Sequence, residues 1–312
     1  MQVTELEYPH SYSKEDFPST VVAAGFFDGV HKGHQKLIET AVALAEQKQQ
    51  QSAVMTFYPH PSVVLKKDVQ HVQYITPLPE KIKIFESLGV DQLFIVTFNE
   101  QLAELLPQEF VDHFFIGLNV RHVIAGFDFS YGRLGRGNME TLPFHSRGEF
   151  EQTIIEKVET EGEKISSTRI RKDMEEGNMQ EVTRLLGRPH SMSGIVVKGD
   201  QRGHTIGFPT ANIEVSSDYL LPRIGVYAVT VRVKGGEFYG MANLGYKPTF
   251  QEDAIRPNIE VNIFDFEGDI YGEPIEVNWY TFIRQEVKFN GIDELVSRLK
   301  QDEREIRRFF SI

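Results

Sequence analysis

The sequence predicts an α/β protein made of two domains, because the pattern of its apolar residues changes near Gly187. Before that point, short apolar runs alternate with amphipathic helical segments, which is typical of a Rossmann-like parallel sheet covered on both faces. After it, apolar and polar residues alternate with a period of two between glycine turns, which indicates an antiparallel β-barrel. A length of 312 residues suits two domains, and we place them at residues 1–186 and 187–312.

Apolar runs predict the strands of the first domain, and amphipathic segments predict the helices between them. The predicted strands are residues 21–24, 53–57, 93–98, 122–125 and 153–158. Helices are predicted from about residue 33, between Pro77 and Gly89, and from Pro107, since proline suits a first helical turn. In parallel sheets ligands bind beyond the carboxyl ends of the strands, so residues that directly follow a strand are candidates for a site.

The connection and the second domain follow different patterns. The charged segment Glu159–Lys164 is predicted to be an exposed connection, and Asn178 with Glu181 has the spacing of a capping box. Residues 226–233, 259–264 and 275–279 have the period of barrel strands. A terminal helix packed outside the barrel is predicted from the spacing of Leu295, Leu299, Ile306, Phe309 and Phe310.

The composition is that of an ordinary globular protein, and it excludes several kinds of chemistry. Hydrophobic residues make up 40% of the chain and charged residues 25%, and the absence of cysteine excludes disulfides, thiol nucleophiles and thiolate metal sites. The net charge of −12 argues against broad binding to nucleic acid or to anionic membranes. The N-terminal segment lacks the pattern of a signal peptide, and no apolar run has membrane-spanning length. We therefore expect a cytoplasmic protein whose partners are small molecules, with homo-oligomerisation left open.

The segment Val21–Lys36, VVAAGFFDGVHKGHQK, places two histidines where a strand passes into a helix. Gly25 and Gly29 free the backbone for a tight turn, and His31 and His34 follow near the helix N-terminus, where unpaired N–H groups favour phosphate. Two imidazoles at such a place suit nucleotidyl transfer, because they can donate hydrogen bonds to phosphates that gain charge. The alternative is a capped helix with two surface histidines. H-x-G-H also occurs in tRNA-charging enzymes, but the acidic balance argues against a tRNA-binding surface.

Two further segments of the first domain could contribute to a site. Ile165–Arg171, ISSTRIR, combines hydroxyls, a helix N-terminus and two guanidiniums, which favours a second phosphate site. An ordinary capped basic helix is the alternative for this segment. Gly126–Phe129 together with Tyr131 could place aromatic rings against a planar ligand, or these rings could simply pack in the core.

The second domain combines a glycine-rich flap, a pair of neutral oxygens and a carboxylate. Gly199–Asn212, GDQRGHTIGFPTAN, contains glycines that can bring the backbone close to phosphates. Thr210 and Asn212 lie two residues apart, so on a strand both side chains face one side, where their oxygens could hold Mg²⁺. Glu260 alternates with apolar neighbours, and a carboxylate aimed into the barrel mouth could take the proton from an attacking hydroxyl. The alternative is a solvent-facing glutamate on an amphipathic strand.

Taken together, ordered motifs in both halves resemble the bacterial bifunctional riboflavin kinase/FAD synthetase family over nearly the whole chain. They are GFFDGVHKGH, MTFYPHP, GFDFSYGRLGRG and ISSTRIR in the first half, and GDQRGHTIGFPTAN, NLGYKPTF, IEVNIFDF and FIRQEVKF in the second. The resemblance implies an N-terminal nucleotidyltransferase domain that adenylylates FMN and a C-terminal riboflavin kinase barrel. ATP, riboflavin and FMN are then substrates, FAD is the product and Mg²⁺ is the metal. Flavin as the substrate rests on the resemblance alone.

For adenylyl transfer, the resemblance implies that His31 and His34 act on the ATP phosphates. Phosphate or pyrophosphate would be held by Ser166, Ser167, Thr168 and the catalytic Arg169. The nucleotide pocket would be shaped by Gly25, Phe26, Asp28 and Gly33. Near the flavin would lie Pro59, His60 and Asp128.

For the kinase step, the resemblance implies that Glu260 is the base for the riboflavin 5′-hydroxyl and that Thr210 and Asn212 hold the metal. The nucleotide-binding flap would use Gly199, Gly203 and Gly207, and the flavin or its flap would be contacted by Arg284 and Glu286. The chain departs from the family pattern at Phe26, where Asn is common, and at Gln285, where Pro is common. A paralogue with only one activity and a non-catalytic flavin-binding protein are the alternatives.

Overall fold

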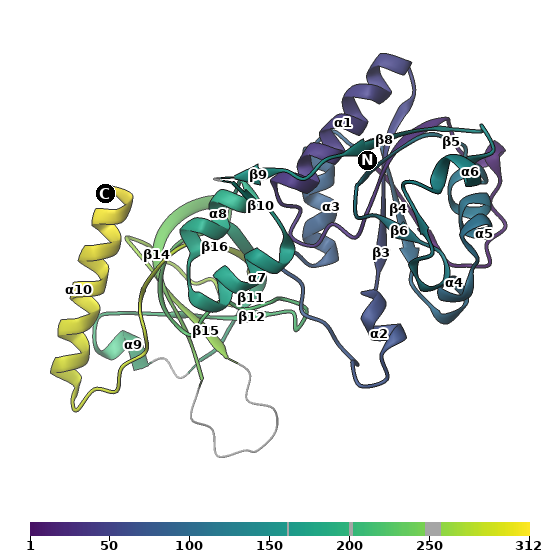
Figure 1. Cartoon of the computed structure of the whole chain (residues 1–312). Coiled ribbons are helices and arrows are strands. Elements are labelled where there is room, and N and C mark those ends of the chain that lie inside the picture. Colours follow the sequence, from purple (N-terminus) through teal and green to yellow (C-terminus); the bar gives the residue numbers. More distant parts are fainter. Residues whose placement is uncertain (161, 200–201, 247–256) are drawn as a thin grey trace. The chain divides into compact units, whose positions relative to one another are not determined.

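The computed structural model describes residues 1–160, 162–199, 202–246 and 257–312. They form two compact units, Met1–Ser167 and Thr168–Ile312 (Figure 1). The predicted fold class is confirmed for both: the first unit has a parallel sheet with helices, and the second has a closed antiparallel barrel and a terminal helix. In the described part of the chain, no helix is long and apolar enough to cross a membrane.

The sheet of the first unit has six parallel strands in the order β1-β4-β3-β2-β5-β8. The strands are β1 (Gln2–Leu6), β2 (Thr20–Ala24), β3 (Gln51–Tyr58), β4 (Gln92–Thr97), β5 (Val120–Gly126) and β8 (Glu151–Ile155). Every predicted strand is confirmed, but β1 was not predicted. This edge strand buries only Leu6, so it has no apolar run for a pattern to detect.

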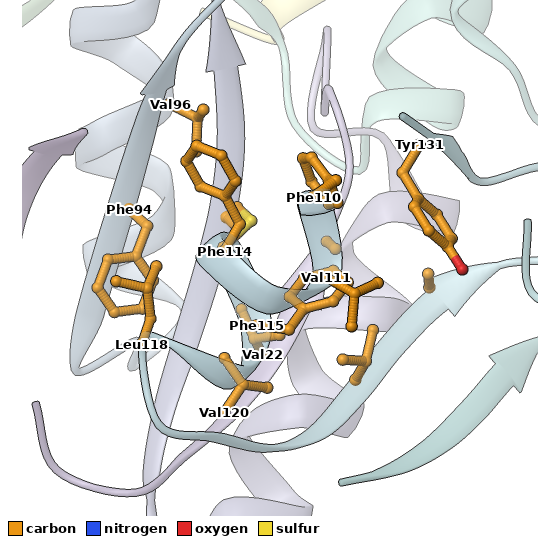
Figure 2. Close-up of a cluster of buried hydrophobic side chains, with 14 of the residues drawn as sticks. Val22, Phe94, Val96, Phe110, Val111, Phe114, Phe115, Leu118, Val120 and Tyr131 are labelled. Carbon is orange, nitrogen blue, oxygen red and sulfur yellow. The ribbon is translucent and has the colours of Figure 1, made fainter. Parts of the chain in front are cut away.

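Alternate residues of the central strands face opposite sides, which gives the sheet two apolar cores. Val21 and Ala23 of β2 pack on the side covered by α1 (Lys32–Lys48) and α3 (Leu78–Ser87). Val22 and Ala24 pack on the other side, which is covered by α4 (Glu100–Glu104), α5 (Pro107–Val111) and the π-helical η2 (Asp112–Ile116). Figure 2 shows this second core, where Phe94 and Val96 of β4 lie near the phenylalanines of α5 and η2. The predicted helices are confirmed.

Short elements complete the first unit. They are η1 (Lys14–Asp16), α2 (Pro61–Leu65), β6 (Ser130–Tyr131), η3 (Arg133–Gly135), β7 (Gly137–Asn138), α6 (Leu142–Ser146), β9 (Glu159–Thr160) and β10 (Glu163–Lys164). The segment predicted to be an exposed connection is exposed at Glu159 and at Gly162–Lys164, and its two short strands, β9 and β10, pair antiparallel. Its residue 161 lies outside the described residues.

The second unit contains a six-stranded barrel, closed in the order β11-β12-β15-β14-β13-β16. The strands are β11 (His190–Val197), β12 (Ala211–Val215), β13 (Gly225–Val233), β14 (Gly236–Gly245), β15 (Asn258–Ile263) and β16 (Pro274–Arg284). The helices are α7 (Ser167–Glu176), α8 (Met179–Leu186), α9 (Arg202–Thr205) and α10 (Ile292–Phe310). The division between the units at Ser167 and Thr168 groups α8 with the barrel, and α8 packs against β16 and β11.

The barrel wall has an apolar inner face and a mixed outer face. Tyr227, Val261 and Trp279 are fully buried inside the barrel. On the outer face, Val226 and Met241 pack with Ile306 of α10 in a separate apolar cluster. The terminal helix is therefore packed outside the barrel, as predicted.

The predicted capping box at the start of α8 is wrong. Asn178 is the N-cap residue, but its side chain makes no capping hydrogen bond. Glu181 does not turn back to the backbone, because its two oxygens accept hydrogen bonds from Arg169 and Arg184. These arginines lower the pKa of Glu181, chiefly through the hydrogen bond from Arg184. Glu181 therefore forms ion pairs with these arginines instead of capping the start of α8.

Candidate active sites

The first candidate site lies where the strand order of the parallel sheet reverses. From β2 the chain continues to β3 and β4 on one side, whereas β5 and β8 lie on the other. Such a switch point is where open α/β sheets bind ligands. The loops that follow β3, β2 and β5 carry His60, the turn Gly25–His31 and Asp128. Because these strands are neighbours, three segments far apart in the sequence end at one edge.

His31 and His34 form a stacked pair at the start of α1. His31 is the N-cap residue, and its Nδ1 accepts a hydrogen bond from the backbone N–H of His34 at 3.2 Å. The two rings are stacked with their centroids 3.6 Å apart. A ring nitrogen that accepts a hydrogen bond carries no proton, so neutral His31 has its proton on Nε2. His31 can thus cap the helix and still donate to a phosphate.

The predicted nucleotide-binding residues surround this pair. A Cβ atom on Gly33 would lie 3.1 Å from the His31 ring, so glycine leaves room for that ring. Asp28 is buried, and its Oδ1 accepts the Thr76 backbone N–H at 3.3 Å. The Ser167 hydroxyl donates to the Asp28 carbonyl at 2.9 Å. The ISSTRIR segment therefore reaches the turn through Ser167.

The predicted flavin-binding residues have partners of their own. The His60 ring lies edge-on to the Phe26 ring, with centroids 4.7 Å apart, and its Nδ1 lies 2.7 Å from Ser62 Oγ. Asp128 forms an ion pair with Lys164 of β10 at 2.8 Å. In the second unit, Arg169 pairs with Glu181 at 2.8 Å. Within the first unit, aromatic and charged groups thus lie at the strand ends, and Asp128 has an oppositely charged partner there, as Arg169 has in the second unit.

Sequence reasoning missed a buried lysine next to the turn. Lys81 of α3 is 1% exposed, and its Nζ donates to the Phe26 carbonyl oxygen at 2.9 Å. Burial lowers the pKa of Lys81 to about 8, although the Asp28 carboxylate acts in the opposite direction. One signal could have found it: Lys81 lies four residues before Phe85, the other fully buried residue of this helix.

The second candidate site is a row of residues across the outer face of the barrel wall. Directly paired positions on five neighbouring strands are Arg284, Val226, Asn243, Glu260 and Asn212. A cavity of about 300 Å³ is lined by four of these residues, Arg284, Val226, Asn243 and Glu260, and by Leu295 and Leu299 of α10. Glu260 was expected at the barrel mouth. It instead faces the outer side, because its neighbours Ile259 and Val261 fill the interior.

Oxygen atoms converge at one end of this cavity. The Asn258 amide donates from Nδ2 to Asn212 Oδ1 at 3.2 Å and to Glu260 Oε1 at 2.8 Å. Thr210 also lines the cavity. Among the described residues, no group of three or more His, Cys, Asp and Glu side chains could hold a metal. The neutral and anionic oxygens here suit a hard cation that keeps water and phosphate ligands, so this donor set fits Mg²⁺.

Two of the flap glycines lie so close to other residues of the barrel unit that a side chain would not fit there. A Cβ atom on Gly199 would lie 2.0 Å from Asn212 Nδ2, and one on Gly203 would lie 2.1 Å from the Phe208 carbonyl oxygen. Gly207 has a φ of +80°, which disfavours any other residue. Within the predicted motifs, Asp200, Gln201 and residues 247–250 lie outside the described residues.

Arg284 and Glu286 flank the same cavity. Arg284 forms an ion pair with Asp302 of α10, with Nη2 2.7 Å from Oδ2, and Arg298 also pairs with Asp302 at 2.9 Å. Asp302 is fully buried. Glu286 accepts a hydrogen bond from Asn243 Nδ2 at 3.1 Å. Both residues line the cavity, and Arg284 ties α10 to the barrel wall.

These features define the class of protein. One unit has a Rossmann-like sheet with a histidine-bearing turn at its switch point, as expected of a nucleotidyltransferase. The other is a barrel with a largely apolar cavity that carries the Glu260 carboxylate and the Thr210 hydroxyl, as expected of a phosphotransferase with a planar substrate. The chain is therefore a two-domain transferase.

Comparisons with known proteins identify the family. A family model described as FAD synthetase matches residues 13–169, and one described as riboflavin kinase matches residues 186–310. The chain is 47% identical to the bifunctional riboflavin kinase/FMN adenylyltransferase of Bacillus subtilis, over 100% of this chain and 99% of the relative. It is 48% identical to the protein of that name from Listeria monocytogenes, with the same coverage.

A solved structure from Streptococcus pneumoniae, titled a macrolide-efflux protein, matches with a TM-score of 0.89 and 36% identity, over 98% of this chain and 99% of that one. The chain belongs to the bifunctional riboflavin kinase/FMN adenylyltransferase family. It is an enzyme that phosphorylates riboflavin to FMN and adenylylates FMN to FAD.

Proposed function

We propose that the two activities use the two sites described above, with adenylyl transfer at the turn after β2 and riboflavin phosphorylation at Glu260. The observation that carries this assignment is that Glu260 and Thr210 line one cavity of the barrel unit, while Asn212 is paired with Glu260 across the strands and linked to it through Asn258. The roles given below to individual residues are our proposal and go beyond the family assignment. The division into catalytic domains at residue 187 is part of the same proposal.

In adenylyl transfer, an oxygen of the FMN phosphate attacks the α-phosphorus of ATP, and pyrophosphate leaves. No protein nucleophile is needed, so the residues act by orientation and by hydrogen bonding. His31 donates from Nε2 to a phosphate oxygen that gains charge, and His34 stacks on it and donates in turn. The phosphates are held by Ser166, Ser167, Thr168 and Arg169, and the nucleotide pocket is shaped by Gly25, Phe26, Asp28 and Gly33. The flavin lies near Pro59, His60 and Asp128.

In the kinase step, the riboflavin 5′-oxygen bonds to the γ-phosphorus of ATP, ADP leaves, and Glu260 accepts the hydroxyl proton. Asn258 supports this role, because its amide orients Glu260 Oε1. Thr210 and Asn212 hold Mg²⁺, which when bound neutralises charge on the transferred phosphate. The flap glycines Gly199, Gly203 and Gly207 lie along the nucleotide, and Arg284 with Glu286 borders the flavin.

The chemistry also sets the order of the two reactions. FMN is the product of the kinase and the substrate of the adenylyltransferase, so riboflavin is converted to FAD in two steps that each consume ATP. A cysteine-free sequence and the need for ATP support a cytoplasmic location. The net charge of −12 supports small molecules, rather than nucleic acid, as partners.

Product analysis tests the proposal directly. The chain is incubated with riboflavin, ATP and Mg²⁺, and the flavins are separated by chromatography. We expect both FMN and FAD. Only one product would favour a paralogue with a single activity, and no product would favour a flavin-binding protein without catalysis.

A further inference from the structure

Lys81 is a buried charged group that the proposed mechanism leaves without a role. Besides its hydrogen bond to the Phe26 carbonyl, its Nζ lies 4.4 Å from the centre of the Phe26 ring and 5.9 Å from that of Tyr74. Removing an ammonium group from water is costly, and the attraction of the buried Asp28 carboxylate, which forms no ion pair with Lys81 within the described residues, is smaller than this cost. An apolar side chain would fill this space at lower cost, so packing alone does not account for the lysine.

The turn beside Lys81 has an unfavourable backbone conformation. Phe27 has a φ of 56° and Val30 a φ of 42°, both in the left-handed region that side chains other than glycine rarely adopt. A β-branched valine there is a particular outlier. Conformations of this kind persist only where surrounding groups hold them, and they concentrate at functional sites. This turn leads directly into His31.

Two buried donors hold the start of the turn at a single atom. The Phe26 carbonyl oxygen accepts from Lys81 Nζ of α3 at 2.9 Å and from Thr56 Oγ1 of β3 at 3.0 Å. A peptide unit is planar, so fixing this oxygen also fixes the N–H of Phe27, the residue with the unfavourable φ. At the other end of the turn, Gln35 Nε2 donates to the Val30 carbonyl at 2.8 Å.

We propose that Lys81 is a positioning residue for adenylyl transfer. It holds the Phe26–Phe27 peptide, and through it the turn that presents His31 at the start of α1. This inference rests on the proposed role of His31. Lys81 itself is too deeply buried to contact a substrate.

The experiment replaces Lys81 with methionine, which has a similar length but neither charge nor donor. We expect kcat for FMN adenylylation to fall about 10-fold to 100-fold, with a smaller change in KM for FMN, because small displacements of catalytic groups have effects of this size. Riboflavin phosphorylation in the same molecule should stay within two-fold. The matched control is Lys83→Met, two residues along the same helix, where the side chain is 63% exposed. The control should leave both activities unchanged.

Thermal stability separates positioning from folding. Lys81→Met should melt at the same temperature as the parent chain or higher, since the cost of burying the Lys81 charge exceeds its attraction to Asp28, and replacing such a charge with an apolar group is often neutral or stabilising. A residue that only supports the fold would lose stability and activity together. Thr56→Val removes the other donor and should cause a smaller loss of adenylylation. The double variant should lose more than the two single effects combined, because the carbonyl then lacks both donors.

Two results would overturn the proposal. One is adenylylation within two-fold of the parent in Lys81→Met, and the other is a lower melting temperature that accompanies the loss. A wrong role for His31 would give a different result. In that case His31→Ala would still adenylylate FMN, whereas Lys81→Met would adenylylate FMN more slowly than the parent.

Discussion

The candidate sites of the two units are built from different kinds of neighbours. In the candidate site of the first unit, the turn Gly25–His31, His60 and Asp128 follow the ends of three adjacent parallel strands, so these residues come from loops. In the second unit, they lie within antiparallel strands and become neighbours through register, as Glu260 does with Asn212 and Asn243. A site made of loops depends on how each loop is held. A site made across strands depends on which face of the wall each residue occupies.

The units also bury charge differently. Lys81 has a carbonyl oxygen and aromatic rings around it, whereas Asp302 lies between the guanidiniums of Arg284 and Arg298. Asp302 forms two ion pairs, whereas the desolvation of Lys81 outweighs its attraction to the Asp28 carboxylate, so removing one of the two charges should have the opposite effect on stability from removing the other. The predictions below test these contrasts, from the largest expected effect to the smallest.

The largest effect is expected from Glu260→Gln. The amide cannot accept the hydroxyl proton, so riboflavin phosphorylation should fall about 10²-fold to 10⁴-fold. FAD formation from supplied FMN should stay within two-fold, because the other unit carries it. Separate assays with riboflavin and with FMN measure this. Glu214→Gln, an exposed residue on β12, is the control. Normal phosphorylation by Glu260→Gln would show that another group is the base.

His31→Ala should give the converse result. Loss of one donor to a charged transition state costs about 10²-fold to 10³-fold, so FMN adenylylation should fall by this amount while riboflavin phosphorylation continues. The readout is pyrophosphate release with FMN as substrate. His71→Ala, which removes an exposed histidine of the same unit, should be silent. If both activities fall equally, the separation into two sites is wrong.

Asp302→Ala tests the buried ion pair of the second unit. It leaves two guanidiniums without their carboxylate, and breaking such a pair costs about 3–5 kcal/mol. Denaturant unfolding should show this loss, and the riboflavin kinase should weaken because Leu295 and Leu299 of α10 line its cavity. Glu303→Ala breaks the neighbouring pair with Arg307, whose side chain is 29% exposed, and should cost about 1 kcal/mol or less. Equal effects of the two variants would contradict the role given to Asp302.

Per pH unit, the smallest effect is a dependence of stability on pH. The folded-state pKa of Lys81 is about 8 against 10.5 for an ordinary lysine, so between these values the unfolded chain binds the extra proton. Stability should therefore rise with pH across this window, by at most about 1.4 kcal/mol per pH unit. Below pH 8 the lysine is charged in both states, and its unfavourable contribution is constant. The measurement is the free energy of unfolding at several pH values for the parent chain and for Lys81→Met. The difference between the two gives the pH dependence that is due to Lys81. Lys83→Met should keep the pH dependence of the parent chain.

Much of the fold could be predicted because its signals are local. The run Val21–Ala24 and the period of α1 identified the strand and helix around His31, and alternation around Ile259 identified a barrel strand. Edge strand β1 was not predicted, because it buries a single residue and therefore has no apolar run. Of the first site, the segments could be predicted, since parallel strands bring their carboxyl ends to one edge. The hydrogen bond of the buried Lys81 could not be predicted, because its partner Phe26 is far away in the sequence, although the helical spacing of Lys81 and Phe85 marks the lysine as buried.

The amino-acid sequence by itself determined the two-part α/β and barrel architecture, the histidine pair and the family, since periodicity and motif order are properties of neighbouring residues. Only the tertiary structure decided that Glu260 faces outward beneath α10, that Glu181 pairs with arginines instead of capping α8, and that Lys81 holds the turn before His31. These outcomes depend on strand register and on contacts between distant segments. Contacts between residues far apart in the sequence form only when the chain folds, so no periodicity or motif of neighbouring residues predicts them.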